Sequence, residues 1–139
     1  MPKTNSLLII AISVLLTTLF SCTKDDTKYD VYFWTSIDPA NEELNLIIDG
    51  ANLGQLPFRS LRPECNNDSL LPKLIFRQLS VGKYDIIARN NEGNDKSVNV
   101  LKIKSNGIGG GGKITRPGSP AGMSVLSIKD CIVIELYYK

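Results

Sequence analysis

The absence of histidine limits the catalytic chemistry that this 139-residue sequence can perform. It has no histidine, and therefore neither the commonest general base and metal ligand nor a Ser-His or Cys-His nucleophile pair. Its 14 carboxylates would have to supply an acid pair in a cleft. Most of them fall in segments with the composition of turns, where solvation is expected. We therefore expect no enzyme activity, no metal and no cofactor.

The first of three cysteines, Cys22, directly follows an apolar segment. Residues 7–20 are the hydrophobic run of a signal peptide, and as a helix they would cover only about 21 Å of a roughly 30 Å membrane core. Residues 19–22, Leu-Phe-Ser-Cys, resemble the lipobox of bacterial lipoproteins. The resemblance implies cleavage before Cys22 and its acylation with chains such as palmitate, which would anchor the protein to a membrane. The alternatives are an ordinary cleaved secretory signal with an incidental cysteine, or a short membrane anchor.

A short polar segment, residues 23–28, separates Cys22 from the rest of the chain. It has no apolar periodicity, which is typical of a tether. Cys22 and the first four residues of this segment, Cys-Thr-Lys-Asp-Asp, are similar to the export signal of surface lipoproteins in Bacteroidetes-type bacteria, which implies the outer membrane. We thus expect a signal peptide at 1–21, a lipidated cysteine and tether at 22–28, and a folded domain at 29–139.

The other two cysteines, Cys65 and Cys131, form an even pair in a domain predicted to be exported. Because oxidising compartments favour disulfides, we expect these two thiols to be bonded to each other. The alternative is two buried free thiols. A metal site is disfavoured because structural zinc needs four ligands and no histidine can complete the set.

The rest of the sequence consists mainly of short runs of apolar residues, and no segment has the apolar stripe of a helix. Residues 44–49 and 83–89 alternate between apolar and polar side chains, as half-buried strands do. Turn-forming pairs such as Asp49-Gly50 separate the runs. The predicted strands are 29–35, 44–49, 53–58, 70–79, 83–89, 97–104, 123–128 and 131–138. This pattern indicates an all-β fold, a single antiparallel β-sandwich.

Two segments also carry a family resemblance. Residues 46–58, Leu-Ile-Ile-Asp-Gly-Ala-Asn-Leu-Gly-Gln-Leu-Pro-Phe, and residues 79–86, Leu-Ser-Val-Gly-Lys-Tyr-Asp-Ile, resemble small PEGA-type and transthyretin-like β-sandwich modules. In those modules one strand ends in Asp-Gly, a glycine and a proline mark the return strand, and Leu-x-x-Gly-x-Tyr opens the next. The resemblance implies an accessory, non-catalytic module with an Ig-like or transthyretin-like sandwich, and the insertion between the two segments leaves the strand order open.

A glycine-rich stretch, residues 107–113, matches two nucleotide-binding patterns, G-x-G-x-x-G and G-x-x-x-x-G-K. A phosphate loop must open a helix, yet Ile114 stands where Ser or Thr is required, and Pro117 and Pro120 follow. We therefore expect a surface loop and no nucleotide. The net charge of +2 likewise gives no reason to expect a nucleic-acid partner.

Aromatic side chains are the best candidates for a binding surface, because Trp and Tyr offer flat apolar faces to sugar rings or partner proteins. The candidates are Tyr32, Trp34, Tyr137 and Tyr138. Alternate side chains of a strand face opposite sides, so about half of them are expected in the core, Trp34 first among them. In addition, Asp68-Ser69-Leu70 is similar to the O-glycosylation acceptor of Bacteroidetes-type exported proteins, which makes Ser69 a candidate site.

Together these features predict a lipid-anchored protein of the cell envelope that works by binding a glycan or a partner envelope protein. The alternative is a structural envelope or fimbrial assembly component, in which a terminal strand such as 131–138 pairs with the edge of a neighbouring sheet. An envelope enzyme or an enzyme inhibitor is the least favoured interpretation.

Overall fold

The computed structural model describes residues 27–66, 69–105, 107–108 and 122–138. In this part of the chain the regular structure is almost entirely β, with a single short 3₁₀ helix, η2 (Leu71–Lys73), and no α-helix. The strands are β1 (Lys28–Thr35), β2 (Leu44–Ile48), β3 (Ala51–Gln55), β4 (Ile75–Ser80), β5 (Gly82–Asn90), β6 (Asp95–Lys104), β7 (Gly107–Ile108), β8 (Gly122–Ile128) and β9 (Cys131–Tyr137). The all-β fold class is therefore confirmed.

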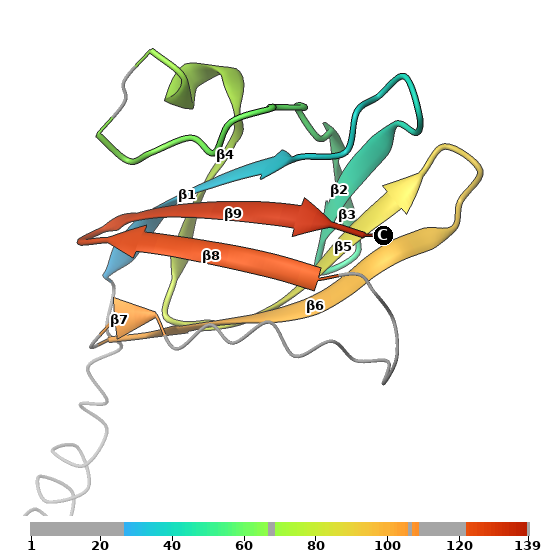
Figure 1. Ribbon diagram of the computed structural model, residues 1–139. Helices are drawn as coiled ribbons and strands as arrows, with labels where there is room; N and C mark the ends of the chain where they lie inside the picture. Colours follow the sequence, from blue (N-terminus) through green and yellow to red (C-terminus); the bar gives the residue numbers. More distant parts are fainter. Residues whose placement is uncertain (1–26, 67–68, 106, 109–121, 139) are drawn as a thin grey trace, which may run out of the picture.

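The strands form two sheets (Figure 1). The four-stranded sheet has the order β4-β1-β9-β8, and the five-stranded sheet has the order β3-β2-β5-β6-β7. All neighbouring strands are antiparallel except β1 and β9, which pair in parallel from Asp30 opposite Cys131 to Thr35 opposite Leu136. The expectation of a purely antiparallel fold is thus wrong at this one pair. The alternation of apolar and polar residues shows which face of a strand is buried, but it does not specify which other strand pairs with it or in which direction.

One hydrophobic core joins the two sheets, as in a β-sandwich. Val31 and Phe33 of β1 are completely buried there, and Ile86 and Ala88 of β5 approach from the other sheet. The intervening residues of β1 point to the opposite face of the four-stranded sheet, because successive strand side chains alternate. The core consists of Tyr29, Val31, Phe33, Leu44, Leu46, Ile48, Leu56, Ile86, Ala88, Leu101, Ile103, Met123, Ile132, Ile134 and Leu136.

The hairpin between β2 and β3 has the turn that its sequence predicts. Asp49 and Gly50 both have positive φ, 48° and 83°, which is the backbone requirement of a two-residue type I′ turn. Gly54, with φ of 101°, lies just past the register shift between Leu46 and Ile47. The return strand consequently begins earlier than predicted, at Ala51 rather than at residue 53, and ends at Gln55.

The predicted strand at 70–79 is divided in two. Its first part forms η2, where Pro72 occupies the first helical turn, and β4 begins only at Ile75. Proline fixes φ near the helical value and cannot donate a ladder hydrogen bond, so the chain turns before it enters the sheet. Because of this break, η2 lies over the face of the four-stranded sheet that is turned away from the core, and it does not lengthen the edge strand β4.

Candidate functional site

The outer face of the four-stranded sheet, the face turned away from the core, carries a second hydrophobic cluster. Trp34 of β1 and Val133 of β9 are buried there beneath Leu71 and Leu74, which come from the η2 region. Tyr32, Cys65, Leu126 and Cys131 pack against this cluster. The connection between β3 and β4 therefore covers part of a sheet face that alternation alone would leave exposed.

A disulfide between Cys65 and Cys131 fastens this connection to the sheet, with the two Cα atoms 5.9 Å apart. The predicted pairing of these cysteines is confirmed. Cys131 opens β9, a strand hydrogen-bonded on both sides, so the bond holds the long connection to the centre of the sheet.

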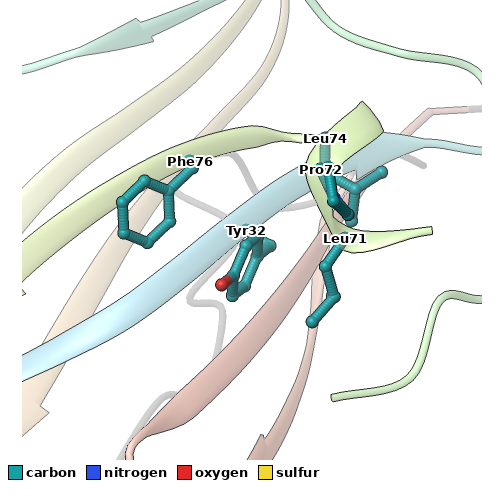
Figure 2. Close-up of a pocket in the computed structure, with 5 residues that line it drawn as sticks. All are labelled: Tyr32, Leu71, Pro72, Leu74 and Phe76. Carbon is teal, nitrogen blue, oxygen red and sulfur yellow. The ribbon is translucent and has the colours of Figure 1, made fainter. Parts of the chain in front are cut away.

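Between η2 and the edge strand β4 the outer face is hollowed into a groove of about 380 Å³. Its lining residues, Tyr32, Leu71, Pro72, Leu74 and Phe76, are drawn in Figure 2. The rings of Tyr32 and Phe76 are 5.2 Å apart between centroids and tilted by 37°. Phe76 is 42% exposed, so part of its ring is available to a ligand. We call this hollow the aromatic groove.

The next residue pair on the same face is polar. Asp30 lies opposite Gln78 on the β1–β4 ladder, and Gln78 Nε2 donates a 3.0 Å hydrogen bond to Asp30 Oδ1. Asp30 also lines a second hollow, of about 430 Å³, next to the disulfide and the β8–β9 turn. The other residues of this polar hollow are Cys65, Asn66, Ile128, Lys129, Asp130 and Cys131.

Of the predicted binding residues, Tyr32 lines the aromatic groove whereas Trp34 lies in the interior. Trp34 is only 3% exposed, because the η2 region covers it, and its indole N–H has no hydrogen-bond partner among the described residues. It therefore packs the floor beneath the η2 region and offers no surface ring. Phe76, which sequence reasoning did not select, provides the exposed ring instead.

The two tyrosines at the C-terminus do not join this groove. The Tyr138 hydroxyl donates a hydrogen bond to Glu42 Oε2, and Glu42 Oε1 also accepts from Asn90 Nδ2 at 2.6 Å and pairs with Lys96 Nζ at 2.9 Å. Lys96 lies 5.4 Å from the centre of the Tyr138 ring. Tyr137 is half-buried beside the backbone of Gly122.

Hydrogen bonds and burial in this C-terminal cluster shift the pKa values of Glu42 and Tyr138. The hydrogen bond from Tyr138 lowers the pKa of Glu42, and Asn90 and Lys96 lower it further against the opposing effect of burial. Burial, together with the hydrogen bond to Glu42 and its negative charge, raises the pKa of Tyr138 to about 12. Both shifts favour the bonded pair at neutral pH, so the cluster fastens the chain end to the loop before β2.

The strand at 131–138, predicted to be available for pairing with a neighbour, is β9 and lies inside its sheet. It is hydrogen-bonded to β1 on one side and β8 on the other, so it has no free edge to offer. The edge strands of this sheet are β4 and β8. The position of the strand overturns that detail of the assembly hypothesis, because only an unpaired edge can add a further strand.

Several predicted features fall outside the described residues. These are the signal peptide, Cys22, the start of the tether, Asp68 of the glycosylation triplet, and most of the glycine-rich stretch. Ser69 is described and is exposed. In the part of the chain that the structure covers, no three His, Cys, Asp or Glu side chains are grouped as metal ligands, and no helix has the length and apolarity to span a bilayer.

Comparisons of this chain with protein-family models, with curated proteins and with solved structures found no match.

Proposed function

We propose that this chain is a lipid-anchored binding or accessory protein of the cell envelope, without catalysis of its own. In this proposal Cys22 carries the acyl anchor, the polar tether spaces the domain from the membrane, and the domain at 29–139 contacts its ligand. The similarity of Cys-Thr-Lys-Asp-Asp at residues 22–26 to a surface-export signal supports a position on the outer membrane, facing the cell surface. The ligand is a glycan or a partner envelope protein.

The observation that carries this proposal is the aromatic groove. Ligand sites are typically hollows lined by apolar and aromatic side chains with a few polar groups beside them. Here the partly exposed ring of Phe76 lies next to Tyr32, and the polar pair Asp30 and Gln78 follows on the same face. The disulfide holds the wall of the groove to a central strand, which lowers the ordering cost of binding.

We further propose that the sandwich is of the Ig-like or transthyretin-like type, as in PEGA-type modules. The type I′ turn at Asp49-Gly50 and the hairpin that follows it agree with the segment on which that resemblance rests. Modules of this kind serve as accessory domains, which agrees with a role in binding.

A second candidate function is assembly into an envelope structure through an edge strand. The free edge of β4 favours it, because edge strands present unpaired backbone groups to a neighbour. Against it stands Arg77, an exposed charge between the core-facing Ile75 and Leu79, whose guanidinium donates to the Phe76 carbonyl oxygen at 2.9 Å. Charged side chains at such positions discourage strand addition, so we place binding first.

Photo-cross-linking in the native cell tests the proposal. A benzophenone side chain is placed at Phe76 in the full-length protein, with Lys102, exposed on the outer face of the other sheet, as the matched control position. Benzophenone inserts into C–H bonds of sugars and proteins alike. We expect an adduct from position 76 and none from position 102. Equal adducts from both positions, or none from position 76, would count against the groove as the contact surface.

A further inference from the structure

The β1–β4 ladder arranges outward-facing side chains in a row whose character changes from apolar to polar. Tyr32 lies opposite Phe76, and two residues further along the same face Asp30 lies opposite Gln78. Because strand side chains alternate, both pairs project from one side of the sheet. An aromatic pair and a hydrogen-bonded carboxylate–amide pair are thus adjacent on one face of the sheet.

An aromatic pair followed by a polar pair is complementary to the chemistry of a sugar ring. A pyranose has an apolar face of C–H groups, which packs against aromatic rings, and a rim of hydroxyl groups that both donate and accept hydrogen bonds. Among the described residues, the bond between Gln78 and Asp30 is the one hydrogen bond that either side chain makes. It engages one carboxylate oxygen of Asp30 and the amide nitrogen of Gln78, so oxygen acceptors on both groups can serve neighbouring hydroxyls.

We propose that the ligand of the aromatic groove is a neutral glycan. One sugar unit packs on the exposed ring of Phe76 beside Tyr32, and its hydroxyls bond to Asp30 and Gln78. This inference rests on the proposed function and names the class of ligand for the same site.

The polar hollow supports a chain of sugars rather than a single one. Asp30 lines this hollow, and Tyr32, the next residue of β1 that faces outward, lines the aromatic groove, so the two hollows lie next to each other along that strand. A second unit would enter the polar hollow and meet Asn66, Lys129 and Asp130. Two carboxylates beside one ammonium give no excess of positive charge, which disfavours a strongly anionic ligand and favours a neutral one.

Affinity electrophoresis of the detergent-solubilised full-length protein tests this inference. The probes are four polysaccharides, soluble starch, mannan, xylan and β-glucan, each cast in a native gel. We expect at least one of them to retard the wild-type protein. Phe76→Leu, which keeps apolar bulk but removes the ring, should weaken that retardation about tenfold, whereas Phe76→Tyr should preserve it.

A second variant examines the polar pair. Asp30→Asn still accepts the bond from Gln78 but removes the charge that strengthens hydrogen bonds to hydroxyls, so we expect another loss of about tenfold. Lys102→Ala, on the other sheet, should leave retardation unchanged. Circular dichroism melting of each variant separates lost binding from lost folding.

The inference is overturned if no polysaccharide retards the wild type, or if Phe76→Leu and Asp30→Asn both bind as well as the wild type. The cross-link at position 76 distinguishes this failure from that of the proposed function. A polypeptide in that adduct would support the groove as a binding site and exclude a glycan as its ligand. An adduct that releases sugar would support both the proposed function and the glycan inference.

Discussion

Removing the disulfide is expected to destabilise the protein strongly and to open the groove wall first. The perturbation is the double variant Cys65→Ser with Cys131→Ser, which avoids leaving a single thiol that could form bonds between molecules. The two cysteines are 66 residues apart, and the segment between them includes all strands from β4 to β8. The bond therefore restricts more than half of the domain in the unfolded chain.

The size of the effect follows from this separation. Closing a loop of 66 residues lowers the entropy of the unfolded chain by about 15 cal/mol/K, which corresponds to about 4 kcal/mol at room temperature. A domain of this size has a total stability on the order of 5–15 kcal/mol, so the loss would be a large fraction. The melting temperature should fall by roughly 15 °C.

Denaturant unfolding of both proteins, followed by Trp34 fluorescence and by circular dichroism, measures this difference. Hydrogen exchange adds a local readout, because residues 69–74 lose their covalent attachment to β9 while the core strands keep their packing. We expect faster exchange there than in β9. A free-energy change below about 1 kcal/mol, or equal acceleration of exchange in both segments, would mean that this bond does not hold the connection on the sheet.

Further predictions concern single residues. Tyr138→Phe should cost about 1 kcal/mol by removing the donor to Glu42, as measured by denaturant unfolding. In an alkaline absorbance titration the wild type should show one tyrosine ionising near pH 12 that this variant lacks. Because folding raises that pKa, the stabilisation should be complete below about pH 10 and disappear as the pH rises through about 12. Gly50→Ala should cost about 1–2 kcal/mol because φ is positive there, whereas Gly82→Ala, where an added Cβ makes only ordinary contacts, should cost less. Trp34→Ala should cost about 3–5 kcal/mol in the same unfolding assay, since the indole is buried in the outer-face cluster.

Much of the fold could be predicted because alternation and turn chemistry are local properties. The segment 44–49 shows its buried face directly in the order of its residues, and it forms β2 almost as expected. The pairing of Cys65 with Cys131 could be predicted because only two cysteines remain after the one assigned to the lipid. Neither inference required knowledge of the partner strand.

The groove could not be predicted because it depends on non-local packing. Trp34 is buried on the outer face only because a distant connection folds over it, which no pattern within β1 indicates. In the sequence, Phe76 is one apolar residue in a predicted continuous strand. Its exposure follows from the break at Pro72 and from the edge position of β4. Aromatic residues near a proline within an apolar run are the signal that could have directed attention there.

Metabolic labelling with a fatty-acid probe examines the proposed lipid anchor at Cys22, which determines where the domain acts. The full-length protein, Cys22→Ala, and the double variant Cys65→Ser with Cys131→Ser are expressed in parallel. We expect the wild type and the double variant to carry the probe and to be found in the membrane fraction, whereas Cys22→Ala should carry none. Equal labelling of Cys22→Ala and the wild type, or an unlabelled wild type, would contradict the proposed anchor.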